Sequence, residues 1–178
     1  GGGTADDPPG VTMADIAMRV SRAAVELLRA HDNGLPAAVG ALSTASGIIH
    51  PPFPPELVRM SNIAADLAEK STVARYPQVT LYCDRVSNRL KEKFRRFSGT
   101  VTLTAEARVS HINLEGIEDN SHLLADAVTE VLDANRGDWG NGMYFGGAYE
   151  VSYGPVKAGG KNFIQITKVT FDVEVSSD

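Results

Sequence analysis

The chain has 178 residues, of which 43% are hydrophobic and 22% are charged. That length suits one compact domain with a real core, and the composition is ordinary for a globular protein. The formal net charge of -5 argues against a surface that is basic throughout, but it does not exclude a local basic patch. Cys83 is the only cysteine, so no internal disulfide is expected. The sequence has neither a long apolar run nor a secretory signal pattern, so we expect no membrane partner.

The first ordered element follows a stretch rich in glycine, proline and aspartate. We expect a flexible arm at residues 1–10, because this stretch has too little apolar surface to bury, and a single domain at residues 11–178. Thr12 is a candidate N-cap with Asp15 three residues later, a pattern that begins helices. Apolar residues then recur at helical spacing as far as Leu28, and Asn33-Gly34 is the expected stop.

Residues 35–55 carry only weak patterning, and the prolines between Pro51 and Pro55 exclude a regular helix there. Residues 56–69 place apolar side chains on one helical face and predict a second helix. The Tyr76-Pro77 pair ends this region, since a residue that precedes proline avoids the helical conformation.

Two strands are expected next. Residues 79–83 alternate apolar and polar side chains over a short stretch, and residues 100–110 alternate strictly. In the longer strand the odd positions are apolar and the even positions are polar. Such alternation predicts an antiparallel sheet with one buried face and one face in water.

The last third of the chain predicts one helix and two strands. The candidate N-caps Asp119, Asn120 and Ser121 introduce a helix that runs to about Ala134. The glycine-rich residues 140–147 are expected to form a loop, residues 149–153 a strand, residues 154–160 a turn and residues 162–175 the last strand. In that strand the apolar positions change face, which indicates either a bulge near Thr167 or a strand covered on opposite sides along its length.

These elements predict an α+β fold: an antiparallel β-sheet of about four strands with two to three helices packed on one face. No motif for catalysis or cofactor binding accompanies them. The four histidines lack metal-ligand spacing, the glycine clusters do not match phosphate-binding loops, and no base is assigned to Cys83. We therefore expect no enzyme activity, no cofactor and no metal.

One cluster departs from the acidic average of the chain. Six basic residues and only one acidic residue lie between residues 85 and 96, with Phe94 among them and Phe97 directly after them. The candidate interface or DNA-facing residues are Arg85, Arg89, Lys91, Lys93, Phe94, Arg95 and Arg96. The segment is either a solvated connection whose cations pair with acids on a neighbouring subunit, or a surface that faces DNA phosphates.

Three stretches of the sequence resemble the tail terminator proteins of siphophages and related prophages. They are YPQVTLYCDRV at residues 76–86 with its continuation KFRRFSGTV at 93–101, the helix end from residue 126 to the DANRGDW run at 133–139, and the closing strand at 163–175. The resemblance covers about residues 76–175, and these stretches are not catalytic signatures.

The resemblance implies a virion protein that caps the tail tube as a homohexameric ring. Such a ring ends tube polymerisation and presents the surface that joins the DNA-filled head. The implied partners are the major tail tube protein, a head-completion or neck protein and the genomic DNA in the lumen. The implied location is the head-proximal end of the phage tail, after assembly in the bacterial cytoplasm. The alternatives are a head-closure or neck connector of the same particle and a small DNA-binding module that uses residues 85–96.

Overall fold

The computed structural model describes residues 12–61, 76–89 and 96–177. The expected arm at residues 1–10 and most of the helix expected at 56–69 lie outside these ranges. The described helices are α1 (Met13–Arg29), α2 (Leu35–Ser46), the short 3-10 helix η1 (Pro55–Leu57) and α4 (Leu114–Ala134). The strands are β1 (Val58–Met60), β2 (Gln78–Asn88), β3 (Phe97–His111), β4 (Gly137–Gly140), β5 (Met143–Phe145), β6 (Tyr149–Tyr153), β7 (Lys157–Gly159) and β8 (Asn162–Ser177).

Helix α1 confirms the first predicted element. The Thr12 hydroxyl accepts a hydrogen bond of 3.2 Å from the backbone N–H of Asp15, and the Asp15 carboxylate accepts one from the backbone N–H of Thr12. This reciprocal pair is a capping box, which satisfies donors that the first helical turn leaves open. The helix ends at Arg29, a few residues before the expected stop.

Helix α2 was not predicted. Gly34 is its N-cap, Pro36 lies in its first turn, and Gly47 closes it with a φ of 74°. A proline in the first turn suits a helix, because the N–H that it lacks has no partner there. Most α2 side chains are small and only Leu35 and Val39 are fully buried, so the helix has no broad apolar stripe to detect. The predicted helix at 56–69 is wrong at its start, where Val58 to Met60 form strand β1.

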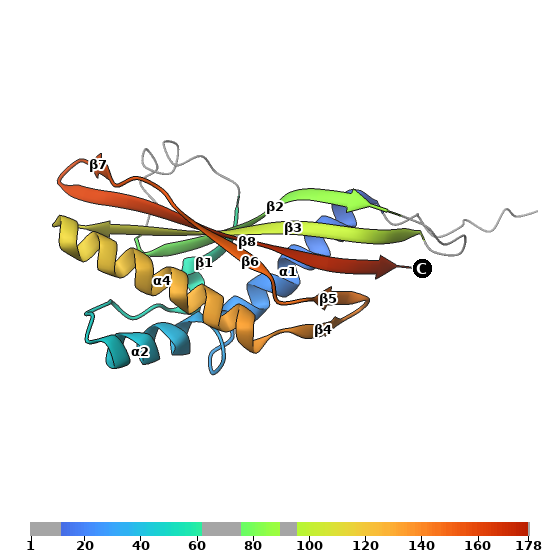
Figure 1. The fold of residues 1–178 in the computed structure, drawn as a ribbon, viewed down its shortest axis with the longest axis horizontal. Coiled ribbons are helices and arrows are strands. Elements are labelled where there is room, and N and C mark those ends of the chain that lie inside the picture. Colours follow the sequence, from blue (N-terminus) through green and yellow to red (C-terminus); the bar gives the residue numbers. More distant parts are fainter. Residues whose placement is uncertain (1–11, 62–75, 90–95, 178) are drawn as a thin grey trace, which may run out of the picture.

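The predicted sheet of about four antiparallel strands is wrong. The structure has an eight-stranded mixed sheet in the order β1-β2-β3-β8-β5-β4, with β6 and β7 also paired to β8, and β1 runs parallel to β2 (Figure 1). Strand β5 lies in the stretch predicted as a loop, β7 in the stretch predicted as a turn and β1 in the stretch predicted as a helix, and β4 follows the predicted end of a helix. Asn141 and Gly142, with φ of 53° and 78°, form the turn that joins β4 to β5, and positive φ is typical of hairpin turns.

The helices form two layers beneath the curved sheet (Figure 1). Helix α1 packs against β1, β2 and β3, helix α4 packs against β3 and β8, and α2 packs mainly on α4. The odd positions of β3 contribute Val101, Leu103, Ala105, Ala107 and Val109 to one hydrophobic core with both helices. The predicted apolar face of β3 is therefore confirmed.

Helix α4 begins earlier than predicted. Its N-cap is Asn113, whose side-chain oxygen accepts a 2.8 Å hydrogen bond from the backbone N–H of Gly116. The candidate caps Asn120 and Ser121 are buried inside the helix instead. Only glycine fits at position 116, because the ring of His111 occupies the space that a Cβ would need.

No bulge causes the change of face in β8, so the alternative predicted near Thr167 is wrong. The β3–β8 register runs without a shift from Phe97 opposite Ser177 to His111 opposite Phe163. Ile164 is buried on the opposite face from Val169, and its side chain lies against Gly159 of β7, where a Cβ would collide with it. The two halves of the strand are thus buried on opposite faces. Strand β7 of the same chain lies against its N-terminal end.

The even positions of β3 do not form a wet face, and this prediction is wrong. Thr104 is 1% exposed and Arg108 is 3% exposed. The strand lies between β2 and β8, so side chains of both neighbouring strands flank its polar ones. Sequence alternation identified the two faces correctly but not the burial of the polar one.

Candidate assembly surface

The basic segment joins β2 to β3. Arg85 lies within β2, Arg89 directly follows it, and Arg96 directly precedes β3. The backbone N–H of Arg89 donates to the carbonyl of Ser98 at 2.7 Å, and that of Arg96 donates to the carbonyl of Ser177 at 3.0 Å. These bonds extend the β2–β3–β8 ladder to the end of the sheet. The remaining candidates, Lys91, Lys93, Phe94 and Arg95, lie outside the described residues.

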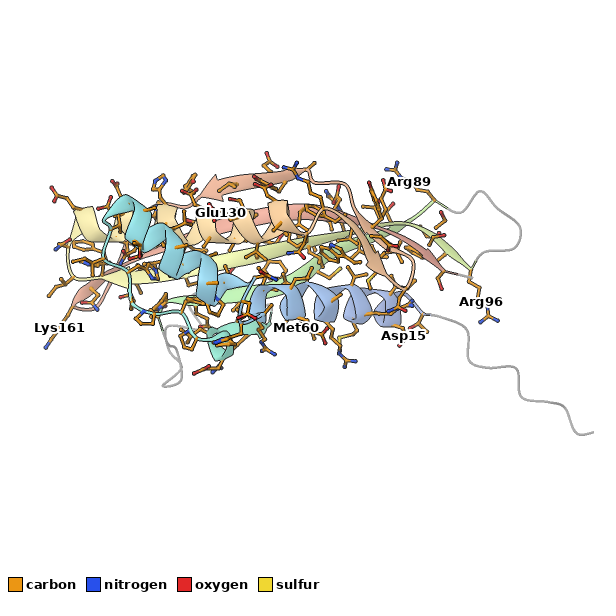
Figure 2. All side chains as sticks on the ribbon, turned by 90° about the horizontal axis from the view of Figure 1, so that it is seen from below. Asp15, Met60, Arg89, Arg96, Glu130 and Lys161 are labelled. Atoms are coloured by element: carbon orange, nitrogen blue, oxygen red, sulfur yellow. The ribbon has the colours of Figure 1, made fainter. Side chains whose placement is uncertain are left out.

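Figure 2 shows the side chains of Arg89 and Arg96 at this end of the molecule, far from Lys161 at the other. Both are exposed. Neither guanidinium makes an ion pair or a side-chain hydrogen bond in the described part of the chain. A hollow beside Arg89 is lined by residues of β3, β5 and β8, among them Tyr144 and Glu174. The structure therefore brings two of the predicted cations together at the sheet end with their charges available to a partner.

Arg85 has a different setting, because the β2–β3 register shifts between Cys83 and Arg85. The bulge makes two consecutive residues face away from the helices. The Thr104 hydroxyl donates to Asp84 Oδ2 at 2.7 Å, and Arg85 Nε donates to the Thr102 hydroxyl oxygen at 3.4 Å. Bulges re-aim side chains in this way. Arg85 is consequently part of a polar layer on the sheet and not of the basic end.

That layer spans the three long strands. The Thr102 hydroxyl donates to Asp172 Oδ1 at 2.6 Å, and the hydroxyls of Thr104 and Thr170 lie 3.1 Å apart. Buried polar groups are costly unless they are hydrogen-bonded. These bonds explain how a face rich in threonine is buried within a stable sheet.

Glu106 is the centre of the layer. Its Oε1 accepts a 2.9 Å hydrogen bond from the Tyr82 hydroxyl, and its Oε2 lies 2.9 Å from Nη2 of Arg108. Lys168 Nζ approaches Oε1 to 3.6 Å. Burial, followed by the hydrogen bond to Glu106 and the charge of that carboxylate, raises the pKa of Tyr82, so the phenol keeps its proton and donates. The carboxylate is held by a donor and two cations.

Sequence reasoning did not single out Glu106 or Tyr82. The available signal was that Glu106 and Arg108 are the only charged residues in the otherwise hydroxyl-rich polar positions of residues 100–110. Opposite charges two positions apart on one strand face the same side. Their pairing was therefore readable, but their neighbours on β2 and β8 required the register.

The described residues offer little for covalent or metal chemistry. No group of three His, Cys, Asp or Glu side chains in the described ranges is placed to hold a metal ion. Cys83 is half-buried, and burial raises the pKa of its thiol, which disfavours the nucleophilic thiolate. Among the helices of residues 12–61, 76–89 and 96–177, none is long and apolar enough to cross a membrane.

Comparison with protein-family models gives no match for this chain, and a search of curated proteins finds none either. The resemblance over residues 76–175 and the surfaces described above therefore support the function of this chain.

Proposed function

We propose that this chain is a phage virion protein that caps the tail tube as a ring of six copies, ends tube polymerisation and forms the surface that joins the head. The observation that carries the proposal is where the resembling segments lie. The described parts of these segments, residues 76–86, 96–101, 126–139 and 163–175, are distant in sequence, yet they supply most of β2, the start of β3, the end of α4 and most of the central strand β8. They form one contiguous unit.

The shape of this unit suits a joining role. Strand β8 has 16 residues, which at roughly 3.3 Å per residue gives a length of about 50 Å. One end carries the exposed cations Arg89 and Arg96 (Figure 2). The other end carries the β3–α4 connection and β7 (Figure 1), where Ile112 is 72% exposed and Leu114 is 55% exposed. The two ends of the sheet thus differ in chemistry, which suits a subunit that contacts several partners, neighbouring copies of itself among them.

The absence of a predicted catalytic constellation agrees with a role in assembly, in which surface complementarity replaces chemistry. Subunits of a ring associate through a heterologous interface that closes on itself. Genomic DNA passing through the lumen would then meet the faces that the ring turns inward. The partners proposed are the tail tube protein on one side and a head-completion or neck protein on the other.

Deletion of the gene from its phage tests this function against the head-closure alternative. Negative-stain images of the lysate are expected to show tubes of irregular length and no joined particles. Complementation with the wild-type gene should restore joined particles. Tails of normal length beside unjoined heads would assign the chain to head closure, and normal particles would exclude both roles.

A further inference from the structure

The exposed side of α4 is acidic along its whole length. Residues Leu114–Ala134 contain six carboxylates and neither lysine nor arginine. All six are exposed, and their spacing of three, four or seven residues places them on one stripe. The stripe consists of Glu115, Glu118, Asp119, Asp126, Glu130 and Asp133.

Edge strand β6 borders this stripe with two tyrosines. The ring of Tyr153, 45% exposed, stacks on His122 with centroids 4.4 Å apart, and burial followed by the charge of Asp126 raises the pKa of its phenol. The Tyr149 hydroxyl lies 3.3 Å from Oδ2 of Asp133. Carboxylates and aromatic faces side by side favour arginine, which pairs with the former and stacks on the latter.

Most charges of this surface and both arginines of the basic end form no ion pair with the residues that the structure describes. Asp133 pairs with Arg136 at 3.0 Å, but no other carboxylate of the stripe forms an ion pair in the described ranges. Strand β6 pairs only with β8 among the described strands, so its outer edge is open. Figure 2 shows Glu130 well separated from Arg89 and Arg96, so one subunit does not bring the two surfaces together.

We propose that the basic end of one copy, with Arg89 and Arg96, docks on the acidic and tyrosine-bordered face formed by α4 and β6 of the next copy. This inference rests on the proposed function, because a ring gives every subunit such a neighbour. The two surfaces differ and lie apart, so the interface between copies is heterologous, and such an interface gives a ring when the rotation between successive subunits closes. Each subunit contacts one neighbour through its basic end and the other neighbour through its α4 and β6 face.

Charge selects a second copy over DNA as the partner of the basic end. The chain has a net charge of -5, so approach of a polyanion is opposed by the rest of the molecule. The acidic stripe has no use in DNA binding, whereas in the ring it supplies the counter-charge for Arg89 and Arg96. Opposite potentials on facing surfaces also fix the register of association.

Charge reversal with complementation tests the proposal. One variant carries Arg89→Glu and Arg96→Glu, and the other carries Asp126→Lys and Glu130→Lys. All four residues are exposed, so thermal unfolding of each variant should match wild type. Association is measured by sedimentation at salt below about 0.1 M, where the Debye length exceeds about 10 Å. A matched control, Lys157→Glu with Lys161→Glu, reverses two exposed charges at the opposite end of the molecule.

Wild type and the control are expected to assemble, and assembly should weaken as salt rises. Each reversal variant alone should associate at least about a hundredfold more weakly, because like charges then face each other. An equimolar mixture of the two variants should assemble again, with the variants alternating around the ring.

Three results would overturn the proposal: wild type that stays monomeric at low salt, reversal variants that assemble like wild type, or a mixture of folded variants that does not assemble. Loss of duplex DNA binding in the arginine variant with unchanged assembly would also overturn it and would assign the basic end to DNA. The gene deletion described above is read independently of sedimentation. A chain can therefore fail this test and still prove to terminate tails.

Discussion

The hydroxyl of Tyr82 on β2 donates a 2.9 Å hydrogen bond to Oε1 of Glu106 on the neighbouring strand β3. Glu106 is buried, so loss of this donor leaves a carboxylate oxygen with fewer partners in a poorly hydrated site. Tyr82→Phe is expected to lower the free energy of unfolding by about 1–2 kcal/mol. Tyr149→Phe, which removes an exposed bond of 3.3 Å, is the matched control and should cost much less. Urea denaturation of both variants measures the difference, and equal costs would contradict the role of Tyr82.

The raised pKa of Tyr82 predicts a loss of stability at alkaline pH. The folded state holds the proton more tightly than the unfolded chain, whose tyrosines titrate near about pH 10. The stabilisation is therefore complete below about pH 10 and falls as pH rises above it. Melting temperatures between about pH 8 and pH 11 should decline less steeply for Tyr82→Phe than for wild type. Parallel declines would show that Tyr82 titrates alike in both states.

Leu103 lies at the centre of β3 and has no exposed surface. Leu103→Asp is expected to prevent folding, because a carboxylate would be buried among apolar side chains without a partner. Leu114→Asp makes the same change at an exposed position and should leave a cooperative unfolding transition. Circular dichroism of the two purified variants checks this, and a folded Leu103→Asp variant would mean that the faces of β3 are assigned wrongly.

Two glycines predict opposite effects of the same substitution. At Gly99 the carbonyl oxygen of Ser87 occupies the place of a Cβ, and backbone on the neighbouring strand has little freedom to move. Gly99→Ala should therefore destabilise the protein by about 2 kcal/mol or more. At Gly40 in α2 nothing lies within 4 Å of a Cβ, so Gly40→Ala should stabilise it by about 0.5–1 kcal/mol. Chemical denaturation should show a lower free energy of unfolding for Gly99→Ala and a higher one for Gly40→Ala than for wild type.

The parts of the fold with strong periodicity were predictable. The helix begun by Thr12 and Asp15 and the apolar face of residues 101–109 are present as expected. Strand β6 was predicted with the bounds that the structure shows. Helix α2 and the strands β1, β4, β5 and β7 were not predicted, because α2 has mostly small side chains and strands of three or four residues are too short to give a periodic signal. The number of strands, and hence the sheet, was wrong for the same reason.

The candidate site was only partly predictable. The sequence located a basic segment, and the structure places Arg89 and Arg96 at the end of the sheet but turns Arg85 into the polar layer. The different settings of Arg85 and of the other two arginines depend on a bulge next to Cys83, which no local sequence pattern indicates. The acidic stripe of α4 was readable as charges, but its position beside Tyr153 required the pairing of β6 with β8.

Tail length measures directly whether this chain ends the tail tube. Tubes should be measured by electron microscopy in lysates of a deletion phage that is supplied with wild-type protein, with the Arg89→Glu and Arg96→Glu variant, or with none. Wild-type protein should give one narrow tube length, and the other two lysates should give a broad distribution that extends to longer tubes. The same narrow length in all three would contradict this role.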